Sequence, residues 1–277
     1  MKITIDGKAA DIALEKEKNL GEVLGGIGEW LAGSGYSLSG LRVNGEDLGA
    51  GAIAGSFDKA LDAIETLDIR TAALPVLMAE ALVALRQTLG DYENAPFEER
   101  PRIEQQWAES PGASFLAECI PDLSGLAART FRGEGPGPAS LASLLEERLR
   151  ELRDPLPELG GIEALVESTA QRLEDLPLDI QTGKDGRAAE TVQIFSAVTE
   201  KLLRIFSLLK LEGFITGGFL IDGMPFEAFI DDFSAALKEL LAAYEAKDAV
   251  LVGDLAEYEL APRLRSFYAA IKTPAAA

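Results

Sequence analysis

The most informative feature of this sequence is a residue that it lacks, because its 277 residues contain no histidine. Without an imidazole the chain cannot form a Ser-His-Asp or Cys-His catalytic arrangement. The usual zinc sites and the carboxylate–histidine di-iron pattern also require histidine. The sequence therefore predicts no cofactor and disfavours most hydrolase and transition-metal chemistry.

Cysteine is almost absent as well, since Cys119 stands alone. One thiol cannot form an internal disulfide and provides no thiol spacing for zinc. Cys119 lies in the apolar segment 114–120, a pattern typical of a buried and inert thiol rather than a nucleophile.

Cations are scarce, with 26 Lys and Arg against 46 Asp and Glu and a net charge of -20. An acidic chain repels phosphate backbones, so nucleic acid and anionic membranes are not expected partners. No apolar run has the length of a signal peptide or a membrane span. These absences predict a cytoplasmic protein. The hydrophobic fraction of 47% is ample for a packed interior.

In the first seventy residues the spacing of apolar residues changes between that of strands and that of a helix, which predicts a small sheet with one helix. Ile3 and Ile5 alternate with polar residues, so residues 2–15 are expected to form a hairpin. Asn19 and Glu22 have capping-box spacing at the start of a helix. Further strands are predicted at 41–43, before a turn at 44–45, and at 65–71. The expected helical face comprises Leu20, Val23, Leu24, Ile27, Trp30 and Leu31.

This order of elements over residues 1–72 resembles the β-grasp (ubiquitin-like) fold. Ubiquitin-like modifiers end in a free Gly-Gly, whereas here the last predicted strand continues through Thr71 into further chain. The resemblance therefore implies the other habitual use of the fold, a small docking surface.

Residues 73–277 are predicted to be helical, which makes the expected class α+β. Pro75 opens a helix that Gly90 should end. Residues 133–138 alternate glycine and proline and predict a flexible linker within this second domain. The predicted domains are thus 1–72 and 73–277.

Residues 188–271 predict three amphipathic helices, because their apolar residues recur at steps of three and four. Such stripes can bury one another and form a helical core. The stripes are Ala188, Val192, Phe195, Val198, Leu202, Ile205 and Leu209; then Phe226, Phe229, Ile230, Phe233, Leu237, Leu240, Leu241 and Tyr244; then Leu251, Leu255, Tyr258, Leu264, Tyr268 and Ile271.

The last predicted helix also carries a cluster of charged residues around a tyrosine. Asp254 and Glu257 share a helix face, and Glu259 and Arg263 have the spacing of an i,i+4 ion pair. A solvated helix face explains the cluster most simply. Its functional interpretation is a partner contact formed by Asp254, Glu257, Tyr258, Glu259 and Arg263.

Two other segments are weaker candidates for partner binding. Lys184 follows Gly183, but Asp185 stands where a phosphate-binding loop needs Ser or Thr. This excludes that motif and leaves either a plain turn or a basic spot, Lys184 with Arg187, for an acidic tail. The apolar loop 214–226 either folds over the core or presents Phe219 and Met224 to another chain.

The sequence favours a non-enzymatic adaptor, scaffold or chaperone that binds a protein partner, either a helical or a basic segment, through its carboxyl-terminal helices. Acidic helical chaperones of protein export have the same general character, although none of their motifs is present. A second hypothesis is an enzyme with magnesium or manganese held by Asp231, Asp232, Asp254 and Glu257. A third is a structural homo-oligomer.

Overall fold

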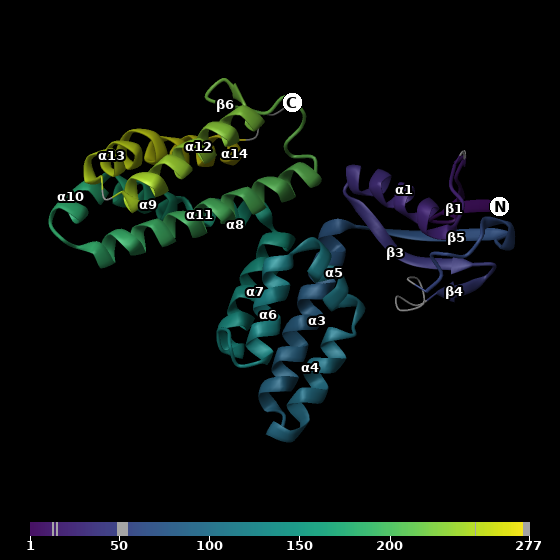
Figure 1. Cartoon of the computed structure of the whole chain (residues 1–277). Helices are drawn as coiled ribbons and strands as arrows, with labels where there is room; N and C mark the ends of the chain where they lie inside the picture. Colours follow the sequence, from purple (N-terminus) through teal and green to yellow (C-terminus); the bar gives the residue numbers. More distant parts are fainter. Residues whose placement is uncertain (13, 15, 49–54, 247, 274–277) are drawn as a thin grey trace. The chain divides into compact units, whose positions relative to one another are not determined.

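The computed structural model describes residues 1–12, 14, 16–48, 55–246 and 248–273 (Figure 1). The chain divides into two compact units, Met1–Leu152 and Arg153–Ala277. A small mixed sheet opens the first unit, and the elements that follow it are almost wholly helical. This arrangement confirms the predicted α+β class.

The amino-terminal sheet has the strand order β2-β1-β5-β3-β4. β1 is antiparallel to β2 and parallel to β5, and β3 is antiparallel to both β4 and β5. Both hairpins close through residues with positive φ, Asp6-Gly7 and Asn44-Gly45, as two-residue type I′ turns require. Within the predicted hairpin 2–15, residues 13 and 15 lie outside the described residues. The strands are β1 Lys2–Ile5, β2 Lys8–Ala9, β3 Tyr36–Val43, β4 Glu46–Leu48 and β5 Thr66–Ala73.

One helix, α1 (Leu20–Gly33), packs its apolar face on this sheet. The Asn19 side chain accepts a hydrogen bond of 2.9 Å from the Glu22 amide, which confirms the predicted cap. Trp30 was expected on the buried face, but its side chain is exposed. The shared core consists of Ile3, Leu20, Val23, Leu24, Ile27, Leu31, Leu41, Val43, Ile64, Leu67 and Ile69. A short 3-10 turn, η1 (Leu61–Ala63), precedes β5.

The opposite face of the sheet is polar, because successive strand residues point to opposite sides. Thr4 donates a hydrogen bond of 2.5 Å to Asp68. The Asp47 carboxylate forms ion pairs with Arg42 at 3.0 Å and with Arg70 at 2.8 Å. Among the described residues, this face therefore carries a network of hydrogen bonds and paired charges.

The remaining helices of the first unit enclose a second, separate core. The first of them, α3, runs past Gly90 to Asn94, so the predicted stop at Gly90 is wrong. Its first residue, Leu74, donates a backbone hydrogen bond of 2.9 Å to Gly35 and joins the helix to the sheet. The elements are α3 Leu74–Asn94, η2 Phe97–Glu99, α4 Arg100–Ala108, α5 Pro111–Cys119, α6 Pro121–Phe131 and α7 Pro138–Arg153.

Residues 133–137 lie in the loop between α6 and α7 inside the first unit, and Pro138, the last residue of the predicted linker, begins α7. The Glu134 amide donates a 2.8 Å hydrogen bond to the Arg129 carbonyl, and a Cβ on Gly135 would lie 2.9 Å from the Thr130 nitrogen. Both helices contribute to one core, and the chain divides into its two compact units between Leu152 and Arg153. The predicted boundary between residues 72 and 73 stays a prediction.

The second unit is a helical bundle around one large core. Aromatic side chains fill its centre, with Phe195 edge-on to Phe233 at 5.9 Å and Phe206 stacked on Phe226 at 4.0 Å. Its elements are α8 Pro155–Gly161, α9 Glu163–Glu174, α10 Leu176–Gln181, α11 Asp185–Leu211, β6 Leu220–Ile221, β7 Met224–Pro225, α12 Phe226–Glu245, α13 Ala249–Asp254, η3 Leu255–Leu260 and α14 Ala261–Lys272.

The predicted stripes of this bundle are confirmed in their inner positions. On α11, every stripe residue except the half-buried Val192 is buried. On α12, Phe229, Phe233 and Leu240 are buried. The stripes fail at Leu241, Tyr244 and Tyr258, whose side chains are exposed.

Candidate partner-binding surface

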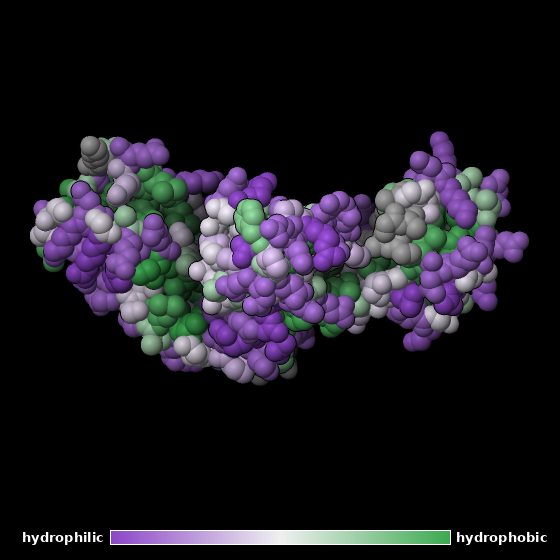
Figure 2. All heavy atoms as spheres, turned by 90° about the horizontal axis from the view of Figure 1, so that it is seen from below, coloured by the Kyte–Doolittle hydropathy of each residue, from purple (hydrophilic) through white to green (hydrophobic). Residues whose placement is uncertain are grey.

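The three exposed residues that break the stripes lie on helices that pack against each other. α12 contacts both α13 and η3. The exposed fractions are 55% for Leu241, 46% for Tyr244, 69% for Val250 and 65% for Tyr258. We call these four residues, with Asp254 and Glu257, the α12–η3 surface. Figure 2, in which the second unit lies at the left, shows exposed hydrophobic residues among hydrophilic ones on the face drawn.

A π-helical turn explains why Tyr258 points outward. η3 is a π-helix, in which hydrogen bonds join residues five apart instead of four. Leu255, Ala256 and Leu260 are the buried residues of this segment, so Leu260, five residues after Leu255, lies inside and Tyr258 lies outside. Pro262 favours this wider turn, because it has no N–H for the Tyr258 carbonyl. The Arg263 guanidinium donates a 3.0 Å hydrogen bond to the Glu259 carbonyl oxygen within the same turn.

Among the charged residues of this segment, Glu259 is held in an ion pair, whereas Glu257 binds the Tyr258 hydroxyl. The Arg263 guanidinium also binds the Glu259 carboxylate, so the predicted i,i+4 pair is confirmed. Hydrogen bonding to Glu257, followed by the negative charges nearby, raises the pKa of the Tyr258 hydroxyl above its ordinary value. Tyr258 is therefore a neutral hydrogen-bond donor at neutral pH. Asp254 and Tyr258 are exposed to solvent, and Glu257 between them is half-buried.

The carboxylates proposed for a metal do not gather into a ligand set. Asp231 and Asp232 are exposed on α12. Within residues 1–48 and 55–273, leaving aside the undescribed 13, 15 and 247, no group of three or more acidic or thiol side chains could hold an ion. The structure gives the metal-enzyme hypothesis no support at these positions.

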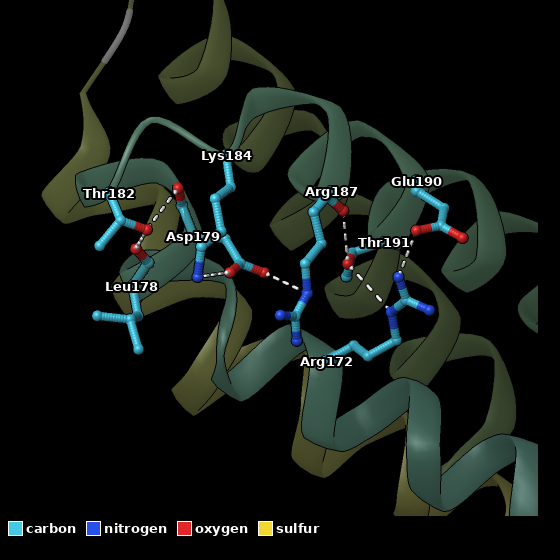
Figure 3. Close-up of polar contacts among 8 residues, drawn as sticks. All are labelled: Arg172, Leu178, Asp179, Thr182, Lys184, Arg187, Glu190 and Thr191. Atoms are coloured by element: carbon cyan, nitrogen blue, oxygen red, sulfur yellow. Dashed lines mark hydrogen bonds and ion pairs between the residues drawn. The ribbon is translucent and has the colours of Figure 1, made fainter.

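The predicted basic spot turns out to neutralise a buried carboxylate (Figure 3). Asp179, on α10, is buried. Its Oδ1 lies 3.6 Å from Lys184 Nζ, and its Oδ2 lies 3.1 Å from Arg187 Nε. The Lys184 amide also donates to the Asp179 carbonyl at 2.8 Å. Both cations thus tie the turn after α10 to the first turn of α11, and an acidic partner would have to compete with Asp179 for them.

Neighbouring residues extend this network along α11. Arg172, on α9, contacts Glu190 at 2.6 Å and donates to the Thr191 hydroxyl at 3.4 Å. Thr191 donates in turn to the Arg187 carbonyl at 3.0 Å. Figure 3 shows these side chains in a row between α9 and α11. These contacts join α9, α10 and the start of α11, and we call this network the structural clamp.

Two alternatives were predicted for the apolar loop 214–226, folding over the core and presenting apolar residues to another chain. One side of the loop packs on the core and the other side is exposed. Its core side is held by Phe219, whose ring lies 5.4 Å from Phe206, and by the fully buried Ile221. Its outer side exposes Phe214, Leu220 and Met224. Phe219 is thus mainly a packing residue, whereas Met224 remains accessible.

Cys119, at the end of α5, is exposed, so its predicted burial is wrong. Partial burial of the thiol and the charge of Glu118 raise its pKa above the ordinary value. The sulfur is therefore protonated at neutral pH and a poor nucleophile.

Sequence reasoning missed Leu241, Tyr244 and Val250 as surface residues. α12 carries apolar residues at 237, 240, 241 and 244, which together span a wider arc than one contact face needs. The width of this apolar arc was the sequence signal that some of these residues would be exposed. Among the described residues, no helix combines the length and the apolar character needed to cross a bilayer.

Two family models match separate parts of the chain. Residues 1–73 match the TP0873 N-terminal domain, and residues 159–270 match a domain of unknown function, DUF8042. An uncharacterized protein of Treponema pallidum (strain Nichols) is 26% identical over 265 residues, which cover 96% of this chain and 93% of the relative. No solved structure matches significantly. None of these descriptions states an activity.

Proposed function

We propose that this chain is a non-enzymatic adaptor, scaffold or chaperone that binds a protein partner through the α12–η3 surface. One observation carries the proposal. Leu241, Tyr244, Val250 and Tyr258 stay about half exposed or more on packed elements whose inner faces are buried. Single exposed apolar residues are normal, whereas several of them on elements that pack against one another suit a protein contact.

The charges around this surface favour a basic amphipathic helix as the partner. Glu245, Asp254 and Glu257 lie on the same elements as the four apolar residues, and Asp248 caps α13. A helix with an apolar stripe and flanking Lys or Arg would match both features. The acidic composition and the lone cysteine support a cytoplasmic location for this interaction.

We further propose that residues 1–72 form a β-grasp domain. The amino-terminal hairpin, the helix on one face and the central position of β5, parallel to β1, support this assignment. The polar network of Arg42, Asp47 and Arg70 on the open face differs from an apolar docking patch. This domain is therefore not the part that we propose for the α12–η3 partner.

The experiment compares the full chain with a double variant, Leu241→Ser with Val250→Ser. Each protein is immobilised, proteins retained from a lysate are identified, and the retained protein is then titrated directly. We expect the double variant to bind it at least about tenfold more weakly, as expected when apolar anchors are removed. The matched control is Leu165→Ser with Leu178→Ser, which alters exposed leucines of the same unit on α9 and α10.

Both double variants should keep the circular dichroism spectrum and melting temperature of the parent within a few degrees. Equal binding by the two variants would contradict the proposal. Light scattering over a concentration series separates the remaining hypothesis. A parent dimer that Leu241→Ser with Val250→Ser converts to a monomer would identify the surface as a self-association interface instead.

A further inference from the structure

A groove in the first unit is a second candidate site, independent of the α12–η3 surface. Its volume is about 700 Å³, and residues of α3, the turn at 95–99, α4 and the start of α5 line it. α3, α4 and α5 contact one another and are drawn together in Figure 1. Protein ligand sites commonly have volumes of about 300–1,000 Å³. The groove is open to solvent rather than enclosed.

The floor of the groove is apolar. Ile103 and Trp107 lie one turn apart on α4 and both line it. Trp107 also packs into the core of this unit, which fixes its indole ring. Gly112 lies against that ring, since a Cβ at this position would be 3.5 Å from the indole. The floor is thus a rigid surface suited to one apolar side chain.

The rim of the groove is acidic. Asp91 and Glu99 line it, and Asp91 forms no ion pair with any described residue. Arg102 also lines the groove, but it reaches Glu99 only at 3.9 Å, and both side chains are mostly exposed. Asn94 donates its amide to the Gly90 carbonyl at 2.8 Å, which leaves its side-chain oxygen as an acceptor. The lining thus has two carboxylates, Asp91 and Glu99, against the one guanidinium of Arg102, and this excess of negative charge favours a cation.

The turn at 95–99, which contributes lining residues to the groove, is held in place. Arg100 donates to the Ala95 carbonyl at 3.3 Å and lies over the Tyr92 ring, 5.2 Å from its centroid. Tyr92 in turn donates to the Phe131 carbonyl at 2.6 Å. A site that is already ordered loses less entropy on binding.

The same turn carries Phe97, whose side chain is 83% exposed. It sits between the lining residues Pro96 and Glu99 in the sequence. Its exposed ring offers further apolar surface next to lining residues in the sequence, which suits a ligand longer than a single amino acid.

We propose that this groove binds an extended peptide segment of a partner protein, with an apolar side chain over Ile103 and Trp107 and an adjacent Lys or Arg near Asp91 and Glu99. The open shape and Phe97 favour a peptide, and the excess of carboxylates selects a basic one. The site, its unit and its ligand differ from those of the α12–η3 surface, so the two proposals are tested separately.

The experiment uses the full chain with Trp30→Phe, which leaves Trp107 as the sole tryptophan because the sequence has two. Its fluorescence is titrated with three acetylated, amidated hexapeptides that share a glycine and alanine frame. One has a central Leu-Lys pair, one Leu-Glu and one Ser-Lys. We expect a saturable change with the Leu-Lys peptide and at least tenfold weaker binding of the other two.

Two variants locate the peptide. Asp91→Asn should weaken the Leu-Lys peptide about twofold to fivefold, the usual range for one exposed ion pair, and the effect should fade at high salt. Its control is Glu80→Gln, an exposed carboxylate of α3 outside the groove. Gly112→Leu should fill the groove and weaken binding at least tenfold. Its control is Gly125→Leu, where a Cβ meets nothing within 4 Å.

Four results would overturn the proposal. They are the absence of a saturable change, equal binding of the Leu-Lys and Leu-Glu peptides, equal effects of Asp91→Asn and Glu80→Gln, and binding of free lysine or spermidine as tight as that of the peptide. Circular dichroism and thermal melts confirm that each variant is folded, and Asp91→Asn keeps the test valid if Gly112→Leu fails to fold.

Discussion

Gly253 lies so close to Pro177 that a Cβ on Gly253 would approach the Pro177 Cγ to 2.8 Å. The contact joins α13 to α10, and Gly253 is buried there. Asp254 follows it directly, and η3 begins one residue later. The position of the α12–η3 surface on the bundle thus depends on the absence of a side chain at residue 253.

Substitution of Gly253 by alanine should destabilise the protein. Alanine has the higher helix propensity by about 1 kcal/mol, but overpacking against a rigid proline ring costs about 1–3 kcal/mol. We expect a net loss of up to about 2 kcal/mol, measured by urea denaturation. Gly90→Ala is the control, because Gly90 lies inside α3 and a Cβ there meets nothing within 4 Å. It should stabilise by about 0.5–1 kcal/mol. Equal effects would mean that the α10–α13 contact is looser than the structure shows.

The aromatic centre of the second unit should be sensitive to truncation. Phe195 and Phe233 are buried and meet edge to face. Phe195→Ala and Phe233→Ala should each lower the free energy of unfolding by about 3–5 kcal/mol. Phe214→Ala, at an exposed position, should change it by less than about 0.5 kcal/mol. A nearly neutral Phe195→Ala would show that α11 presents a different face to the core.

Much of the fold follows from local sequence signals that act over a few residues. Asn19 caps α1 because its side chain reaches an amide three residues on, and this spacing is visible in the sequence. Asn44-Gly45 tolerates positive φ at both positions and so forms the hairpin turn. The inner face of α11 follows from regular helical spacing.

The surface could not be predicted in the same way, because it depends on departures from regular geometry and on distant contacts. The π-helical turn before Pro262 changes the spacing, so a residue at an α-helical inner position, Tyr258, faces outward. Asp179 had no special spacing that would indicate burial, and its pairing with Lys184 and Arg187 arises only when α10 and α11 meet. The sequence placed both cations on a turn but could not show their partner.

The contacts between α9 and α14 should make part of the stability depend on acid. The Arg265 guanidinium contacts Glu167 at 2.8 Å and also binds Glu174. Its hydrogen bond and charge lower the pKa of Glu167 below the ordinary 4.5. Below that value the unfolded chain binds more protons than the folded one, so this contribution is present above about pH 4.5 and is lost as pH falls through the lowered pKa.

Arg265→Gln should therefore reduce the loss of stability on acidification. At pH 7 the variant should be less stable than the parent by about 1 kcal/mol or less, because the pairs are partly exposed. Between pH 5 and pH 3 its free energy of unfolding should fall less steeply than that of the parent, measured by urea denaturation at each pH. Lys238→Gln, which removes an exposed cation of α12, should leave the parent's pH dependence unchanged. The same slope in Arg265→Gln as in the parent would place the acid sensitivity elsewhere.

The buried carboxylate at Asp179 provides the last test, because it separates a structural clamp from a free basic spot. Asp179→Asn keeps the shape of the side chain but removes the charge that Lys184 and Arg187 neutralise. We expect a loss of about 1–3 kcal/mol, below the cost of breaking a fully buried pair, since both cations are half exposed and regain water. Glu190→Gln removes an exposed partner of Arg172 and should cost less than about 1 kcal/mol. If Asp179→Asn is as mild as Glu190→Gln, the two cations are held only weakly, and an acidic partner could recruit them.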